Sequence, residues 1–207
     1  MRVALALAVL AAASAPAAGQ QVRAPALGGA ELLTALRGGG FIIYVRHADT
    51  DHQQKDVRPL KLADCTQQRN LTDRGREHAR AIGAAIRALA IPVGPVLASP
   101  YCRTVETAEL AFGAAERADA LRDPGRAPAG SPERFPALRA LLSAAPPAGT
   151  NEVLVGHAYP FYSLVGGQFL DEGQAAVVRP QGAGFEVVAR VGLKEWHELA
   201  QLPRKSE

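Results

Sequence analysis

The sequence predicts an α/β protein built on a mostly parallel sheet with helices on both faces. Three short apolar segments without alternation carry this prediction, because such runs are typical of strands covered on both faces: Phe41–Val45, Val96–Ala98 and Glu152–Val155. Near the C-terminus, Ala175–Arg179 and Phe185–Val191 alternate around the turn PQGAG. This pattern indicates a hairpin, so we expect an antiparallel C-terminal edge on the sheet.

Helical patterns lie between the apolar segments, with residues at their ends that favour helix starts and stops. The predicted helices are, in chain order, Ala30–Arg37, a helix capped by Thr72 or Asp73 and ended by Ile91-Pro92, Arg103–Phe112, a helix from Ser131-Pro132-Glu133 through Leu142, and a helix from about Pro160 to Val165. Residues 51–70 are polar and aperiodic, and we expect a long surface loop there.

The N-terminus has the pattern of a secretory signal. An apolar run over residues 3–13 follows Arg2, and small residues over 15–19 suit cleavage by signal peptidase. A helix over this run covers roughly 16 Å of the roughly 30 Å bilayer core, which favours a signal peptide over the alternative, an uncleaved anchor. We expect residues 1–19 to be a signal peptide and 20–207 a single domain, exported to the periplasm or secreted.

Composition narrows the class of protein. The chain of 207 residues is 48% apolar and 21% charged, which is typical of a soluble globular protein. The formal net charge is +3, and the cationic residues are scattered along the chain. This distribution argues against a nucleic-acid partner and against a stable membrane association after signal cleavage, and it leaves the oligomeric state open.

The two cysteines of the chain, Cys65 and Cys102, do not have the spacing of a metal site. Because export places them in an oxidising compartment, we expect a disulfide between them, the alternative being two unrelated buried thiols. Such a bridge would fasten the loop 51–70 beside Arg103.

Polar residues follow each of the three apolar strands. Arg46-His47 comes after the first strand, Ser99–Arg103 after the second and His157 after the third. Since ligands bind beyond the carboxyl ends of parallel strands, we expect these residues to meet at one edge of the sheet. Guanidinium groups of Arg46 and Arg103 would hold phosphate oxygens, a neutral His47 could act as nucleophile, and a protonated His157 could donate to the phosphate.

The segment FIIYVRHADTDH also allows a different interpretation, a metal site. Asp49, Asp51 and His52 imitate a cluster of ligands, but Arg46 beside them is electrostatically unfavourable for a dication. We therefore favour a solvated loop rim for these three residues and expect no metal.

Four motifs in order resemble the histidine phosphatase superfamily, also called phosphoglycerate-mutase-like: VRHADT, NLTDRGREHA, SPYCRTVETA and LVGH. The resemblance implies a three-layer α/β/α sandwich and an enzyme that works without metal or cofactor through a phosphohistidine on His47. It implies that Arg46, Arg103 and His157 bind the phosphoryl group of a small phosphorylated substrate. The expected activity is that of a phosphoric monoester hydrolase.

Departures from the family's motifs refine these expectations. Ala158 follows His157 where the acid-phosphatase branch has an aspartate, so the resemblance is to the branch without that His-Asp motif. The general acid would then be Asp123 or, less plausibly, Glu106. Two alternatives remain open, a phosphomutase and a non-catalytic protein of the same fold that binds phosphorylated ligands.

Overall fold

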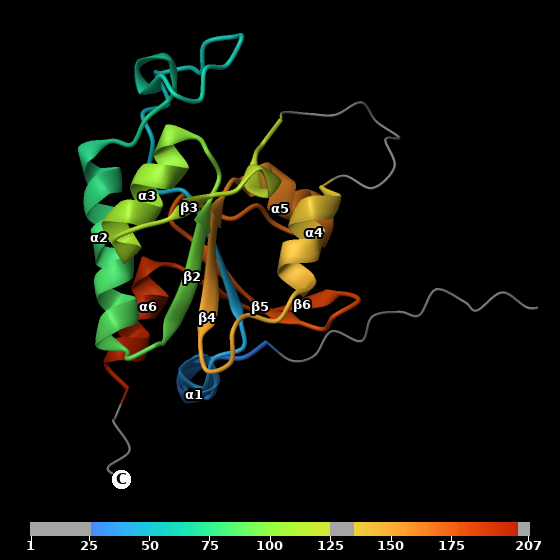
Figure 1. The fold of residues 1–207 in the computed structure, drawn as a ribbon. Coiled ribbons are helices and arrows are strands. Elements are labelled where there is room, and N and C mark those ends of the chain that lie inside the picture. Colours follow the sequence, from blue (N-terminus) through green and yellow to red (C-terminus); the bar gives the residue numbers. More distant parts are fainter. Residues whose placement is uncertain (1–25, 125–134, 203–207) are drawn as a thin grey trace, which may run out of the picture.

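A computed structural model of the chain describes residues 26–124 and 135–202, and it centres on one sheet (Figure 1). The sheet has six strands in the order β3, β2, β4, β1, β5, β6. In that order their bounds are Glu116–Arg117, Val93–Ala98, Asn151–Gly156, Ile42–Arg46, Ala175–Pro180 and Phe185–Val191.

Strand directions agree with the predicted sheet. β4 runs parallel to both β1 and β2, and β2 is parallel to β3. β5 is antiparallel to β1 and to β6, which forms the C-terminal edge. The sheet is mixed, with a parallel centre and the expected antiparallel edge. The short strand β3 was not predicted, because its polar residues Glu116 and Arg117 become a strand only by pairing with Leu97 and Ala98.

Helices cover both faces of the sheet, so the predicted three-layer α/β/α sandwich is confirmed (Figure 1). One face packs against α1 (Gly29–Gly38), α2 (Asp73–Ala88), α3 (Cys102–Phe112) and α6 (Leu193–Ala200). The other packs against α4 (Pro136–Ser143) and α5 (Ala158–Val165).

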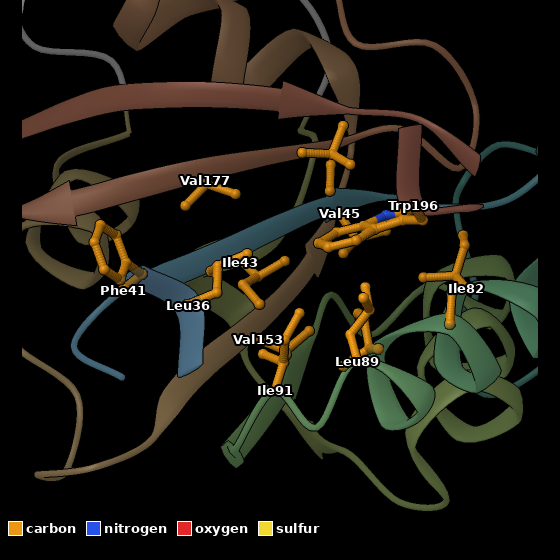
Figure 2. Close-up of a cluster of buried hydrophobic side chains, with 14 of the residues drawn as sticks. Leu36, Phe41, Ile43, Val45, Ile82, Leu89, Ile91, Val153, Val177 and Trp196 are labelled. Carbon is orange, nitrogen blue, oxygen red and sulfur yellow. The ribbon is translucent and has the colours of Figure 1, made fainter. Parts of the chain in front are cut away.

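Strand β1 is the centre of both hydrophobic cores. Ile43 and Val45 belong to the larger core, which Trp196 of α6 closes, and Figure 2 shows these side chains together. Ile42 and Tyr44 point to the opposite face, into the smaller core. Because both faces of β1 are fully buried, its sequence is continuously apolar and does not alternate.

Helix positions agree with the predicted ones within a few residues. Thr72 caps α2, and its hydroxyl accepts a hydrogen bond from the Gly75 backbone N–H. The predicted helix start at Ser131-Pro132-Glu133 lies outside the described residues, as does the predicted signal segment 1–19. None of the helices in the described ranges has the length and hydrophobicity needed to cross a membrane.

The predicted disulfide is present between Cys65 and Cys102, whose Cα atoms are 5.7 Å apart. It joins residues separated by 37 positions and ties the loop 51–70 to the first turn of α3. Gln68, which is buried, adds a second tie by accepting a hydrogen bond from the Cys102 backbone N–H at 3.0 Å. This long loop is therefore held against the carboxyl edge of the sheet.

Candidate active site

Residues that follow β1, β2 and β4 meet at the carboxyl edge of the sheet. The β1–β4 register places Arg46 opposite Gly156, and the His47 backbone N–H donates to the Gly156 carbonyl at 3.0 Å. His47 and His157 therefore face each other, with their ring centroids 5.6 Å apart. The structure brings these two histidines together as the sequence predicts.

His47 is held in one tautomer and is 2% exposed. Its Nδ1 lies 2.9 Å from the carbonyl oxygen of Ala48. Because a carbonyl oxygen only accepts hydrogen bonds, Nδ1 must carry the proton, which leaves the lone pair on Nε2. Burial, together with the charge of Arg103, lowers the pKa of His47 well below its ordinary value. The hydrogen bond and the lowered pKa together favour a neutral imidazole with its lone pair on Nε2.

The turn after His47 is fixed by α3. The Ala48 backbone N–H donates to Thr107 Oγ1 at 3.1 Å, and that hydroxyl in turn donates to the Arg103 carbonyl at 2.6 Å. All three residues are buried. The carbonyl that sets the tautomer of His47 is thus positioned through the same helix turn that carries Arg103.

Tyr44 fixes the backbone of His157 from the middle of β1. Its hydroxyl accepts from the His157 N–H at 3.0 Å and donates to the His157 carbonyl at 2.8 Å. Burial raises the pKa of this hydroxyl, so it remains protonated and can make both bonds. A Cβ on Gly156 would lie 2.2 Å from the same oxygen, which explains glycine before His157.

The side chain of His157 lies between Ser99 and Tyr101. Its Nε2 is 2.9 Å from Ser99 Oγ, and the Tyr101 ring packs edge-on at 4.8 Å. Burial and then the charge of Arg103 lower the pKa of His157 well below its ordinary value. The lowered pKa favours the neutral form of His157, and the prediction that His157 acts as a protonated donor stays a prediction.

Both predicted arginines lie at the same edge of the sheet as the two histidines, Arg46 at the end of β1 and Arg103 in the first turn of α3. Arg103 is 4% exposed, stacks over Tyr101 at 4.5 Å and donates to Asp56 Oδ1 at 3.1 Å. Arg46 donates to the Leu170 carbonyl at 2.7 Å. The Nε–H groups of both arginines are buried and have no hydrogen-bond partner among the described residues. These two donors are available to an anion.

Sequence reasoning missed three charged residues of this site. Arg69 and Asp56 come from the disulfide-tied loop, and the charge of Arg69 contributes to the low pKa values of both histidines. Glu172 lies before β5 and contacts Arg46 and Arg69. One signal could have found Glu172: because β5 is antiparallel to β1, its first residues must lie at the edge where β1 ends.

The two candidate acids lie in different places. Asp123 is on the Tyr101 side of the site, where Tyr101 donates to its backbone carbonyl at 2.8 Å. Its charge adds to the effect of burial in raising the pKa values of Tyr44 and Tyr101. Glu106 instead accepts from Arg76 Nε at 2.6 Å. Asp123 is therefore nearer to the groups that surround His157.

The three residues that imitate a metal cluster take separate partners. Asp49 binds Arg74 and His78, Asp51 accepts from the Gln53 backbone, and His52 contacts Arg69 and Glu172. Within the described ranges, no group of three or more His, Cys, Asp or Glu side chains could hold a metal ion. Asp49 is also less solvated than expected, since its side chain is 18% exposed.

The two histidines and three arginines at the carboxyl edge of this α/β/α sandwich are groups suited to binding a phosphoryl group. The family model of the histidine phosphatase superfamily (branch 1) matches residues 42–125. This match covers less than half of the chain and agrees with the resemblance that the sequence motifs show. A search of curated proteins found no match.

Several solved structures have a similar fold. The protein histidine phosphatase SixA complexed with tungstate is 17% identical with a TM-score of 0.51, over 74% of this chain and 97% of that one. A mutant phosphoserine phosphatase from Entamoeba histolytica, in complex with phosphoserine, is 11% identical with a TM-score of 0.52, over 75% and 98%. The protein TTHB049 from Thermus thermophilus is 22% identical with a TM-score of 0.50, over 73% and 99%. At these identities the comparison supports the fold.

Proposed function

We propose that this protein is an exported phosphohydrolase that removes a phosphoryl group from a phosphomonoester through a phosphohistidine on His47, without a metal. One observation carries the proposal: the Nδ1–H of His47 is held by the Ala48 carbonyl, which leaves Nε2 as the nucleophile. The low pKa of His47 keeps that nitrogen unprotonated at neutral pH. His157, Arg46 and Arg103 surround it as phosphate ligands.

In the first step the Nε2 lone pair of His47 forms a bond to phosphorus while the bond from phosphorus to the leaving oxygen breaks. The leaving oxygen takes a proton from the general acid, for which we propose Asp123. In the second step water attacks phosphorus, the P–N bond breaks, and the acid's carboxylate recovers a proton from the water. The guanidinium groups of Arg46 and Arg103 offset the charge on the transferred oxygens throughout.

The nucleophile is tested by His47→Ala with p-nitrophenyl phosphate as substrate. We expect loss of turnover in this variant, while His197→Ala, on the exposed face of α6, keeps wild-type activity. EDTA should leave the wild-type rate unchanged. Full activity of His47→Ala would exclude the mechanism, and loss of the wild-type rate in EDTA would exclude metal independence.

The general acid is tested by its dependence on the leaving group. Asp123→Asn should slow the hydrolysis of alkyl phosphates more than that of p-nitrophenyl phosphate, because p-nitrophenolate leaves without needing a proton. The control is Asp119→Asn, whose side chain is 81% exposed. Equal losses on both substrates would assign the acid elsewhere.

Export is supported by the signal-like segment 1–19 and by the disulfide, which is stable in an oxidising compartment. Expression of the whole chain followed by cell fractionation and intact-mass measurement tests it. We expect the exported fraction to lack a segment of about the length of a signal peptide. A full-length mass confined to the cytosol would contradict export.

A further inference from the structure

We propose that Glu172 is a positioning residue of this active site, which holds Arg46 and Arg69 at the pocket and does not itself act on the substrate. The inference rests on the proposed function, since it concerns the same pocket. Glu172 is in the loop before β5, and its side chain is only 12% exposed.

The carboxylate of Glu172 is surrounded by donors. Its Oε1 lies 3.4 Å from Arg46 Nη2 and 3.7 Å from Arg69 Nη1, and it accepts from Thr50 Oγ1 at 2.7 Å. Its Oε2 accepts from the Thr50 backbone N–H at 3.1 Å. One carboxylate therefore links the end of β1, the turn after it and the disulfide-tied loop.

These contacts argue against a role as general acid. Both oxygens of the Glu172 carboxylate accept hydrogen bonds from Thr50, and Oε1 also faces two guanidinium groups, so the carboxylate is already engaged by groups of the protein. It is also on the Nδ1 side of His47, at 4.0 Å, while the reacting nitrogen is Nε2. Glu172 therefore lies on the side of the His47 ring opposite to the reacting nitrogen, and we assign it no contact with the leaving group.

His52 completes a closed ring of contacts with Glu172 and Arg69. Arg69 Nη1 lies 3.1 Å from His52 Nδ1, and since arginine only donates, Nδ1 must be the acceptor. The proton of a neutral His52 is then on Nε2, which is 3.4 Å from Glu172 Oε2. Arg69 is held by both residues in one orientation.

The loop that carries Glu172 is hydrogen-bonded to the backbone of His47. The Gly173 backbone N–H donates to the His47 carbonyl at 2.9 Å. Gly173 has φ +78°, and a Cβ there would lie 2.4 Å from the ring of His78, which is itself held by Asp49 at 2.7 Å. The carboxylate therefore has a fixed position relative to His47.

A positioning role and a simple charge effect predict opposite changes in anion affinity when Glu172 is neutralised. By Coulomb's law, a negative charge near the pocket repels an anion, so neutralising Glu172 would tighten anion binding if the arginines stayed in place. If Glu172 holds the arginines, its neutralisation releases them and weakens anion binding. The direction of the change therefore distinguishes the two.

The experiment measures tungstate binding by calorimetry and p-nitrophenyl phosphate turnover for Glu172→Gln and Glu172→Asp. Gln keeps the shape and removes the charge; Asp keeps the charge and shortens the reach. We expect both variants to bind tungstate at least about tenfold more weakly and kcat to fall about 10- to 100-fold, as misplacement of groups by about 1 Å can cause. Thermal unfolding of each variant verifies that it is folded.

The matched control is Glu186→Gln, which breaks another carboxylate–arginine pair, at 3.1 Å from Arg179 on the β5–β6 edge. It should leave tungstate affinity and kcat unchanged. Unchanged or tighter tungstate binding in both folded Glu172 variants would overturn the inference. Because binding is measured without turnover, an inactive wild type would refute the proposed phosphatase and still leave the role of Glu172 decided by tungstate.

Discussion

Single side chains and carbonyls fix the tautomer of His47 and the backbone position of His157. The Nδ1–H of His47 donates to the Ala48 carbonyl, which leaves the Nε2 lone pair for the nucleophilic role proposed above. The backbone of His157 is held by one hydroxyl, that of Tyr44, in the core below the site. At this scale the position of the two histidines depends on neighbouring residues that hold them.

Tyr44→Phe tests that dependence. The change leaves the buried N–H and C=O of His157 without their partner, so we expect a loss of about 1–3 kcal/mol in the free energy of unfolding. Turnover of p-nitrophenyl phosphate should also fall, because His157 loses its fixed position. Denaturant unfolding and steady-state kinetics measure both effects. Tyr162→Phe, whose ring stacks on Phe169, is the control, and equal behaviour of the two variants would contradict the assignment.

Packing between helices positions the elements that carry these residues. α2 and α3 approach so closely that a Cβ on Gly83 would lie 1.9 Å from the Ala111 carbonyl oxygen. α3 carries Arg103 and also Thr107, which accepts a hydrogen bond from the Ala48 N–H. The close packing of α2 and α3 therefore positions both residues.

Gly83→Ala should therefore force α2 and α3 apart. We expect a destabilisation of about 1–3 kcal/mol, typical of overpacking, measured as a lower midpoint of urea unfolding. Gly38→Ala is the control, because no atom lies within 4 Å of a Cβ built there. A Gly83→Ala variant as stable as this control would show that the helices adjust without cost.

The disulfide is another contact between elements, because it ties the loop that carries Asp56 and Arg69 to α3. Replacing both cysteines by serine should lower the free energy of unfolding by about 4 kcal/mol, the chain-entropy value for such a loop. Activity should fall in conditions where the variant is still folded. Unchanged kinetics would mean that the bonds of Gln68 and Asp56 hold the loop without the bridge.

The whole molecule should respond to pH through its two buried histidines. Both have a folded-state pKa well below the ordinary 6.5. As the pH falls below that value, the unfolded chain binds protons that the folded chain does not, so stability falls with falling pH. With two such groups the slope approaches about 2.7 kcal/mol per pH unit between 6.5 and the folded pKa values.

Urea unfolding across this pH range measures the slope. His47→Asn and His157→Asn should each remove about half of it, while His197→Asn, which is exposed, should leave it unchanged. A slope that survives both buried-histidine variants would place the linkage in other groups.

Local patterns determined most of the architecture. β1 could be predicted because burial on both faces leaves a continuous apolar run, and α2 because Thr72 is a good cap before helical spacing. The four motif residues could be predicted because each lies directly after an apolar strand or in the turn that follows it. They are Arg46, His47, Arg103 and His157. β3 could not, since its two polar residues have no strand signal of their own.

The sequence by itself determined the fold class, the strand ends and the four motif residues, because these depend on neighbours along the chain. Only the tertiary structure decided the roles of Glu172 and Arg69, because their contacts join segments far apart in sequence. It also decided that the pKa values of both histidines are lowered, since burial and the distance to Arg103 exist only in the folded chain. Charge states depend on the environment of a side chain, and no motif encodes that environment.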